Sequence, residues 1–198
     1  LCDLTDVEAV ERLIDDNTCC LFLEIMTNPQ LEVVDVRALT AIAHQHGIPV
    51  IADTTLIPFT QFSAKDLGID LEVVSSTKYI SGGATSLGGL VIDYGTFPSI
   101  GKRLLNEMLF NLGAYMTPQV AYMQTLGLET LDVRYRAQAG NALELAQRLR
   151  TLKPIHKVNY VGLEDNPYHQ LAVSQYGETA GAMVTIDLES QEACFRML

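Results

Sequence analysis

Short apolar runs alternate with stretches of helical periodicity over the first half of this 198-residue chain. The run at residues 19–25 is almost continuously apolar, which is typical of a strand buried on both faces of a parallel sheet. Further strands are indicated at 48–53, 71–75 and 89–93. The alternation predicts an α/β fold in which a mostly parallel sheet is flanked by helices.

Helix signals lie around these strands. Thr5-Asp6-Val7-Glu8 has the sequence of a capping box, and Asp35 and Gly47 are placed to begin and end a second helix. A short helical stretch is expected at 64–67. After residue 94 the pattern predicts helices at 102–110, 118–126 and 130–152, strands at 156–160 and 182–188 separated by a loop at 162–167, and a helix at 191–198.

The change of pattern predicts two domains. We expect a large domain at residues 1–135 and the start of a smaller α+β C-terminal domain at 136–198, which includes the connecting helix. The chain begins at Leu1 rather than Met and stops inside a helical pattern, so we expect it to be a piece of a longer protein.

Charge and cysteine usage restrict the partners. The net charge is -11, and the sequence has none of the Lys/Arg clusters that a nucleic-acid backbone requires. Its apolar runs are too short to span a membrane, so we expect neither nucleic acid nor membrane as a partner. The four cysteines form no CxxC pair, which predicts reduced thiols in the cytoplasm rather than disulfides or zinc, with Cys19 and Cys20 in the core.

Polar residues follow three of the expected strands. Asn28 comes after the first strand, Asp53 ends the second, and Ser75, Thr77 and Lys78 follow the third. Ligands of parallel α/β sheets bind at the carboxyl ends of the strands, so these residues should converge on one rim. Neither of the glycine pairs that follow meets the dinucleotide fingerprint, because both precede a strand rather than a helix. His44 and His46 are interpreted as charges at a helix C-terminus rather than as a metal pair.

The residues on this rim match the requirements of pyridoxal 5′-phosphate (PLP) chemistry. The Lys78 amine can form and exchange an imine, and the Asp53 carboxylate can keep a pyridine nitrogen protonated. Ser75 and Thr77 offer hydroxyls to a phosphate, and Asn28 offers an amide to the phenolic oxygen of the ring.

Several segments resemble the Cys/Met-metabolism PLP enzymes, in the order and spacing of that family. They are Asn28-Pro29, Ala52-Asp53-Thr54-Thr55, Ser75-Ser76-Thr77-Lys78-Tyr79, Gly88-Gly89 and Gly127-Leu128-Glu129-Thr130-Leu131. The resemblance implies a fold type I large domain that binds PLP. Lys78 would be the Schiff-base lysine and proton carrier, and the roles of Asp53, Ser75, Thr77 and Asn28 would be those given above. Thr55 matches a threonine that packs near the ring.

Two positions depart from the family pattern: Thr54 stands where Asn is usual, and Gly82-Gly83 stands where Gly-His is usual. The family's ring-stacking aromatic residue and its arginine for the substrate carboxylate belong to parts that are not found in this sequence. The large domain is therefore expected to lack its N-terminal part.

Residues 92–97, 124–131 and 162–169 are most similar to the O-acetylhomoserine sulfhydrylase branch. That likeness implies replacement of acetate on O-acetylhomoserine by sulfide or a thiol, giving homocysteine or methionine, and a homodimer or homotetramer. Cystathionine γ-synthase, cystathionine γ-lyase and methionine γ-lyase stay open as alternatives. So do a non-catalytic fragment of this fold and a nucleotide-binding α/β domain.

Overall fold

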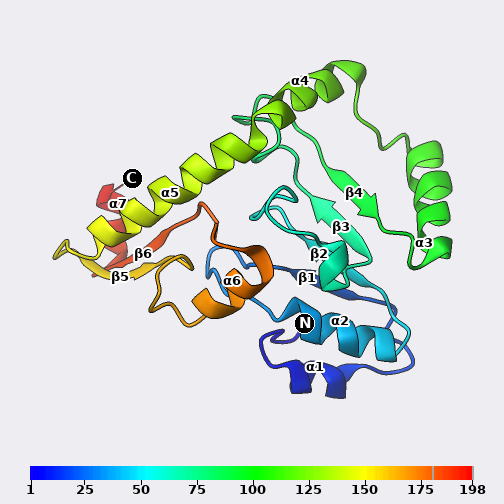
Figure 1. Ribbon diagram of the computed structural model, residues 1–198, viewed down its shortest axis with the longest axis horizontal. Helices are drawn as coiled ribbons and strands as arrows, with labels where there is room; N and C mark the ends of the chain where they lie inside the picture. Colours follow the sequence, from blue (N-terminus) through cyan, green and yellow to red (C-terminus); the bar gives the residue numbers. More distant parts are fainter. Residues whose placement is uncertain (180, 198) are drawn as a thin grey trace.

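The structure is a computed structural model that describes residues 1–179 and 181–197 (Figure 1). Four strands form one sheet in the order β1 (Leu21–Glu24), β2 (Val50–Asp53), β3 (Leu71–Val74) and β4 (Leu90–Asp93). β1, β2 and β3 run parallel, and β4 pairs antiparallel with β3. The mostly parallel sheet flanked by helices is confirmed.

Two helices lie together on one side of this sheet, α1 (Val7–Leu13) and α2 (Val36–Gln45) (Figure 1). Val36, Leu39 and Ala43 of α2 are spaced at helical intervals and are fully buried against the sheet core. Asp35 caps α2 by accepting a bond from the Ala38 N–H at 3.0 Å, and Gly47 follows the helix with a φ of 69°. Both expected ends of this helix are confirmed.

The N-terminus of α1 differs from the expected capping box by one residue. Asp6, not Thr5, is the N-cap, and its carboxylate accepts a bond from the Ala9 N–H at 2.9 Å. Thr5 instead bonds to Asp3 through both its backbone N–H and its hydroxyl. A carboxylate is an equally good cap and carries charge toward the helix dipole, so it takes the position.

The first strand is not buried on both faces, which corrects the prediction for residues 19–25. β1 begins only at Leu21, Cys19 is exposed and Cys20 is half-buried. Phe22 is 59% exposed although Leu21 and Leu23 are buried. β1 lies at the edge of the sheet, and among the described residues only its face toward α2 is covered, so alternate side chains face outward.

The second half of the chain is largely helical. α3 (Pro98–Arg103) continues into a π-helical segment η2 (Leu104–Phe110), followed by α4 (Pro118–Glu129) and the long α5 (Leu131–Leu149). α5 runs from the four-stranded sheet toward a two-stranded antiparallel sheet of β5 (Ile155–Asn159) and β6 (Thr185–Leu188) (Figure 1). The chain also contains the short 3₁₀ helix η1 (Lys65–Leu67) and α7 (Gln191–Met197); Leu198, in the last expected helix, lies outside the described residues.

One helix, α6 (His169–Tyr176), has no counterpart among the sequence predictions. It has no side-chain cap at its N-terminus and no charged residue beyond His169, so the usual start signals are absent. Its Ala172 and Tyr176 belong to the core of the four-stranded sheet, and the Tyr176 hydroxyl donates to the Ile25 carbonyl at 3.3 Å. α6 follows residue 136 in the sequence, yet it packs on the core of the expected large domain. The domain division at 135/136 therefore stays a prediction.

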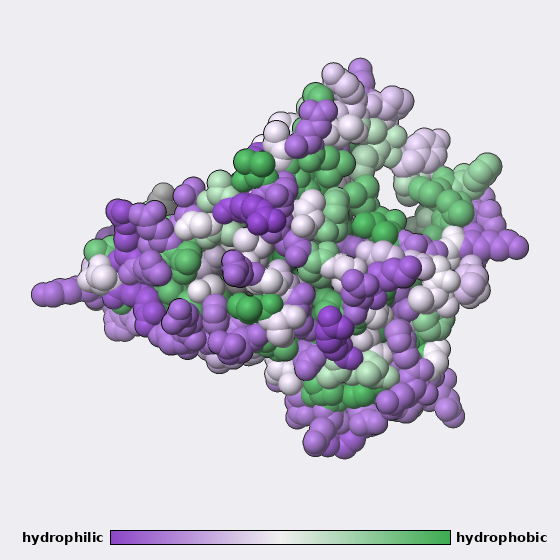
Figure 2. All heavy atoms as spheres, viewed as in Figure 1, coloured by the Kyte–Doolittle hydropathy of each residue, from purple (hydrophilic) through white to green (hydrophobic). Residues whose placement is uncertain are grey.

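Within the described part of the chain, no helix combines the length and the apolar character needed to cross a membrane. Hydrophilic residues cover much of the end that holds β5, whereas apolar side chains gather beside α3 and α4 (Figure 2). Phe110, at the end of η2, and Leu112 and Tyr115, in the segment before α4, are strongly exposed.

Candidate active site

A cavity of about 500 Å³ lies where β1, β2 and β3 end. Five of the six residues proposed from the sequence line it: Asn28, Asp53, Thr55, Ser75 and Lys78. The parallel strands bring these side chains together, as their positions at the strand ends predict. This volume is within the usual range for sites that hold small molecules and cofactors.

Two hydrogen bonds order the residues at the ends of β2 and β3, and one of them joins the two strand ends. The Thr55 N–H donates to Asp53 Oδ1 at 2.8 Å, which holds the carboxylate at the strand end. The Ser75 N–H donates to the Thr55 hydroxyl at 2.9 Å. Asp53, Thr55 and Ser75 are each only partly buried, so their polar groups face the cavity while their backbone is fixed.

Lys78 lies in a tight turn directly after β3. Its N–H donates to the Ser75 carbonyl at 3.2 Å, and the Ser81 N–H closes the next turn on the Ser76 carbonyl at 2.9 Å. The side chain is exposed on the cavity. Among the described residues, neither the Lys78 amine nor the Ser75 hydroxyl has a hydrogen-bond or ion-pair partner, so both are available to a ligand.

Thr77 lies apart from the other proposed residues. It is not among those that line the cavity, and its hydroxyl accepts the Gly88 N–H at 2.9 Å and donates to the Gly88 carbonyl at 3.2 Å. These bonds tie the lysine turn to the start of β4. The phosphate role expected for Thr77 stays a proposal, and it requires the hydroxyl to exchange at least its donated bond.

The sequence reasoning missed Glu24 and Arg134. Glu24 pairs in register with Asp53 across β1 and β2, so the two carboxylates lie on the same face of the sheet. Glu24 is the single carboxylate in the apolar run at residues 19–25, and it pairs with Asp53. A charged residue in such a run is a sequence signal that could have identified it. Arg134 comes from α5 and is held by the Gly127 carbonyl at 2.7 Å and the Thr130 hydroxyl at 3.0 Å. Its place depends on tertiary packing, which no local pattern gives.

Other missed lining residues come from the loops and from the second half of the chain: Met26, Leu56, Tyr79, Gly82, Gly83, Gln138 and Met183. Gly82 and Gly83 have φ values of 80° and 154°, and a side chain would be strained at either position. Burial raises the pKa of the Tyr79 phenol, so Tyr79 stays neutral at the cavity wall. Its ring packs edge-on against Tyr135, with centroids 5.2 Å apart.

The groups that line the cavity fit PLP. An unpartnered amine, a carboxylate fixed at a strand end and a free hydroxyl are complementary to an aldehyde, a protonated ring nitrogen and a phosphate. Lys78, Asp53 and Ser75 supply these three groups, and the Asn28 amide lies on the same cavity. The donor set therefore agrees with the chemistry that the sequence predicts.

Known proteins agree with this assignment. The chain is 38% identical over 183 residues to canavanine γ-lyase of Pseudomonas canavaninivorans, covering 92% of this chain and 45% of that protein. The structure of O-acetylhomoserine sulfhydrylase from Wolinella succinogenes superposes with a TM-score of 0.86 at 39% identity, over 98% of this chain and 61% of the other.

A putative O-acetylhomoserine (thiol)-lyase from Campylobacter jejuni superposes with a TM-score of 0.92 at 29% identity, over 98% of this chain and 56% of the other. Its crystal structure contains a lysine joined to PLP. The chain spans about half the length of the curated relatives it matches.

The sequence profile of the family described as Cys/Met metabolism PLP-dependent enzymes matches residues 1–198, the whole of the chain. The fold, the lysine turn and this match lead to one conclusion: the chain belongs to the Cys/Met metabolism PLP-dependent enzyme family.

Proposed function

We propose that the protein to which this chain belongs is a PLP-dependent enzyme that acts at the γ carbon of a sulfur-pathway amino acid. The observation that carries the proposal is the single cavity that Lys78 and Asp53 line, after the ends of β3 and β2. A backbone N–H holds the Asp53 carboxylate, and a backbone bond fixes the turn that carries Lys78, so both residues are positioned before any ligand binds.

PLP, when bound, supplies an electron-poor ring that stabilises negative charge at the substrate α carbon. Asp53 would hold the ring nitrogen in its protonated form, because a carboxylate stabilises a nearby positive charge. Ser75 would donate its hydroxyl to the phosphate, and Asn28 would donate its amide to the phenolic oxygen. Thr55 would orient Asp53 and pack near the ring.

Lys78 would hold the cofactor through its amine in the resting protein. Once the substrate amine takes its place, the freed Lys78 amine would act as a general base at the α carbon. It would then carry a proton toward the γ carbon, where the leaving group departs. The exposed position of the side chain on the cavity supports such a role, since no neighbouring group has to be displaced.

The specific reaction that we favour is replacement of acetate on O-acetylhomoserine by sulfide or a thiol, giving homocysteine or methionine. The 39% identity to the Wolinella succinogenes sulfhydrylase and the TM-score of 0.92 to the Campylobacter jejuni protein support this choice.

A γ-lyase activity is the second candidate. The observation in its favour is the 38% identity to a canavanine γ-lyase, close to the identity with the sulfhydrylase. Cystathionine γ-synthase, cystathionine γ-lyase and methionine γ-lyase also belong here. All of these reactions break a bond at the γ carbon, and they differ in the leaving group and in whether a second nucleophile adds.

A substrate panel on the full-length protein to which this chain belongs separates the candidates. O-acetylhomoserine, O-succinylhomoserine, cystathionine, methionine and canavanine are each supplied with and without sulfide, and products are identified by mass spectrometry. Our proposal requires that O-acetylhomoserine with sulfide gives the highest kcat/KM and homocysteine as product. Preferred turnover of methionine or canavanine, with release of a keto acid and no need for sulfide, would establish the γ-lyase alternative instead.

We also propose that the protein is a cytoplasmic homo-oligomer, a dimer or a tetramer. The apolar side chains that gather beside α3 and α4 support an association surface (Figure 2), as do the exposed Phe110, Leu112 and Tyr115 in the segment between α3 and α4. The four cysteines are unpaired thiols, as in a reducing compartment. Sedimentation of the full chain would give the oligomeric state, and a monomer at micromolar concentration would contradict the proposal.

A further inference from the structure

Glu72 is a buried carboxylate for which the proposed chemistry has no use. It lies in the middle of β3 with an exposed fraction of 0%, on the opposite face of the sheet from the cavity. A buried carboxylate costs several kcal/mol of desolvation unless it is well hydrogen-bonded. The strand is otherwise apolar, so a methyl-bearing side chain would fill this place without that cost.

Two hydroxyls satisfy Glu72. The Thr54 hydroxyl donates to Oε1 at 2.6 Å, and the Tyr94 hydroxyl donates to Oε2 at 2.6 Å. Burial and the neighbouring Glu72 carboxylate raise the pKa of the Tyr94 phenol, so Tyr94 keeps its proton for donation. Among the described residues no ion pair includes Glu72, and these two bonds are its side-chain contacts with polar groups.

Thr54 connects Glu72 to the cofactor site. It directly follows Asp53, is itself 0% exposed, and its N–H donates to the Val73 carbonyl at 3.0 Å. Its side chain therefore ties the end of β2 to β3 on the covered face of the sheet. On the cavity face, the bond from Ser75 to the Thr55 hydroxyl makes a second tie between the same two strands.

Asp53 directly precedes the two residues that make these ties, Thr54 and Thr55. Its carbonyl accepts a bond from the Ile25 N–H at 3.1 Å, so its backbone is held from β1 as well. With Thr54 held on one face and Thr55 on the other, the peptide that carries the Asp53 carboxylate has little freedom to move relative to the lysine turn.

We propose that Glu72 is a positioning residue that acts through Thr54 to fix the Asp53 carboxylate against the ring nitrogen of PLP. This inference rests on the proposed function, because it assumes PLP in the cavity. It goes further by assigning a role in cofactor binding to a carboxylate on the far face of the sheet. Thr54, which stands where the family pattern has Asn, supplies the hydroxyl that donates to Glu72 Oε1.

The test measures PLP affinity by absorbance titration of the full chain after the cofactor has been removed. Glu72→Gln keeps the volume but can accept only one of the two hydroxyl bonds, and Thr54→Val keeps the shape but removes the donor. Each should weaken PLP binding about tenfold, the effect of one lost hydrogen bond to a charged group. Thr54→Ser retains the hydroxyl and should bind PLP as the wild type does.

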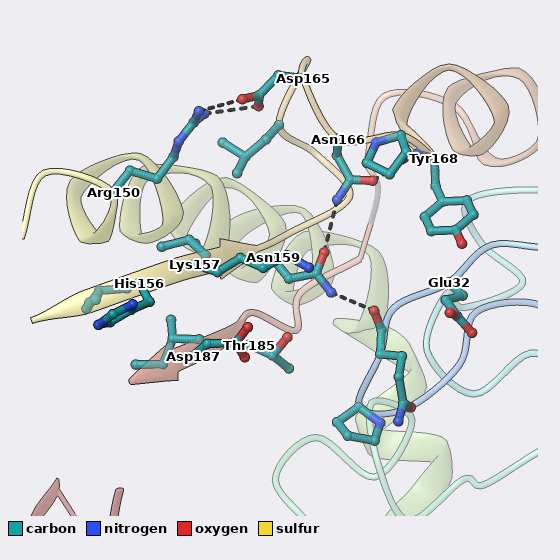
Figure 3. A pocket seen from close by; sticks show the side chains of 17 residues that line it. Glu32, Arg150, His156, Lys157, Asn159, Asp165, Asn166, Tyr168, Thr185 and Asp187 are labelled. Atoms are coloured by element: carbon teal, nitrogen blue, oxygen red, sulfur yellow. Dashed lines mark hydrogen bonds and ion pairs between the residues drawn. The ribbon is translucent and has the colours of Figure 1, made fainter. Parts of the chain in front are cut away.

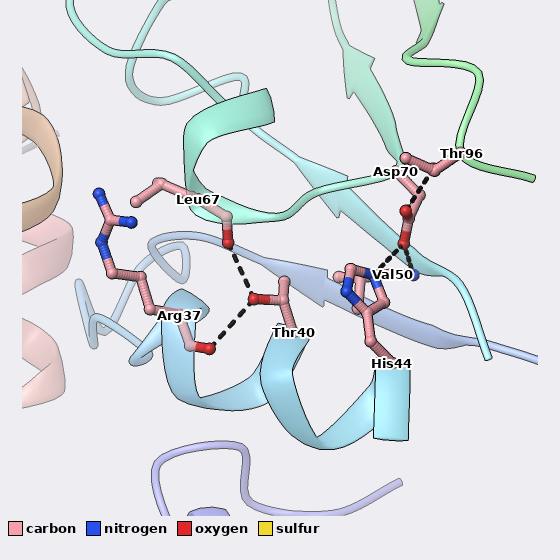
Figure 4. Close-up of polar contacts among 7 residues, drawn as sticks. All are labelled: Arg37, Thr40, His44, Val50, Leu67, Asp70 and Thr96. Atoms are coloured by element: carbon pink, nitrogen blue, oxygen red, sulfur yellow. Dashed lines mark hydrogen bonds and ion pairs between the residues drawn. The ribbon is translucent and has the colours of Figure 1, made fainter. Parts of the chain in front are cut away.

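Asp70 provides a matched control at the other end of the same strand. It is 1% exposed and accepts bonds from the Val50 N–H, the Thr96 hydroxyl and His44 (Figure 4). Asp70→Asn disturbs an equally buried carboxylate at the end of the sheet remote from the cavity. It should lower the urea midpoint of unfolding as Glu72→Gln does, but leave PLP affinity unchanged.

The double variant Thr54→Val with Glu72→Gln makes the test specific to the pair. If Glu72 acts through Thr54, the double variant binds PLP no more weakly than the worse single variant. Wild-type affinity in Thr54→Val and Glu72→Gln, or an equal loss in Asp70→Asn, would overturn the inference and leave the proposed function intact. A wild-type chain that binds no PLP would overturn both.

Discussion

Two hollows in this molecule differ in size and in chemistry. The larger, about 900 Å³, lies between the two-stranded sheet and the loop after β1 (Figure 3), and the smaller, about 500 Å³, is lined by Lys78 among others. In the larger one two pairs of lining side chains bond to one another. The two terminal guanidinium nitrogens of Arg150 donate to the two carboxylate oxygens of Asp165. The Asn166 amide donates to Asn159 Oδ1 at 3.0 Å. In the smaller one an amine and a hydroxyl have no partner among the described residues.

Each hollow also has a lysine, Lys157 in the larger and Lys78 in the smaller. Lys157 projects from a strand of the small sheet, whereas Lys78 lies in a turn at the end of a parallel sheet, facing Asp53 across the cavity. The difference shows that volume alone does not locate the chemistry of this chain. The smaller hollow is the one at the carboxyl ends of the parallel strands, where ligands of α/β sheets bind.

Removal of each lysine in turn should give the largest difference between the two hollows. Lys78→Ala should abolish the visible absorbance band of the bound cofactor and all turnover, because no other lysine among the described residues lines the cavity. Lys157→Ala should keep both at wild-type levels. Absorbance spectra and a product assay on the two variants check this, and an unchanged band in Lys78→Ala would refute it.

Asp53→Asn should give the next largest effect. The amide keeps the shape of the side chain but cannot hold a proton on the ring nitrogen, so kcat should fall about a hundredfold or more. Steady-state kinetics over a range of substrate concentrations would show a loss mainly in kcat, with little change in KM. A variant that retained more than half of the wild-type kcat would mean that Asp53 does not face the ring.

Ser75→Ala should have a moderate effect on cofactor affinity. Loss of one hydroxyl donated to a phosphate should weaken PLP binding about tenfold. Thr77→Ser is the matched comparison, because it keeps the hydroxyl that ties the lysine turn to Gly88. Absorbance titration of both variants would give the two affinities, and equal affinity of Ser75→Ala and wild type would remove Ser75 from the phosphate site.

Arg150→Ala should give the smallest effect. The ion pair with Asp165 is exposed, with side-chain exposures of 46% and 62%, so its loss should cost at most about 1 kcal/mol of unfolding free energy. PLP affinity and kcat should not change. Urea unfolding and the same titration test this, and a loss of PLP binding would show that the larger hollow contributes to the site.

Much of the site could be predicted from the sequence because its residues follow strands. Asp53 and Lys78 lie at strand ends, where a parallel sheet brings them together whatever the helices do. Arg134 and Met183 lie far along the chain and reach the cavity only through the packing of α5 and of the loop before β6. No local pattern encodes that packing.

Two details show where residue type alone misleads. Cys19 is apolar enough to suggest a core strand, yet the strand starts two residues later at the edge of the sheet. Thr77 has the hydroxyl that a phosphate needs, yet that hydroxyl already bonds to Gly88. The edge position of β1 decides the first case and the bonds to Gly88 decide the second, and both are visible only in the fold.

The most direct test of the central claim is to locate the cofactor on the chain. The full chain is incubated with PLP, reduced with borohydride, digested, and mapped by mass spectrometry. The account predicts a pyridoxyl mass on Lys78 and none on Lys157 or the remaining lysines at positions 65, 102 and 153. A label on Lys157, or an even distribution over all five lysines, would contradict it.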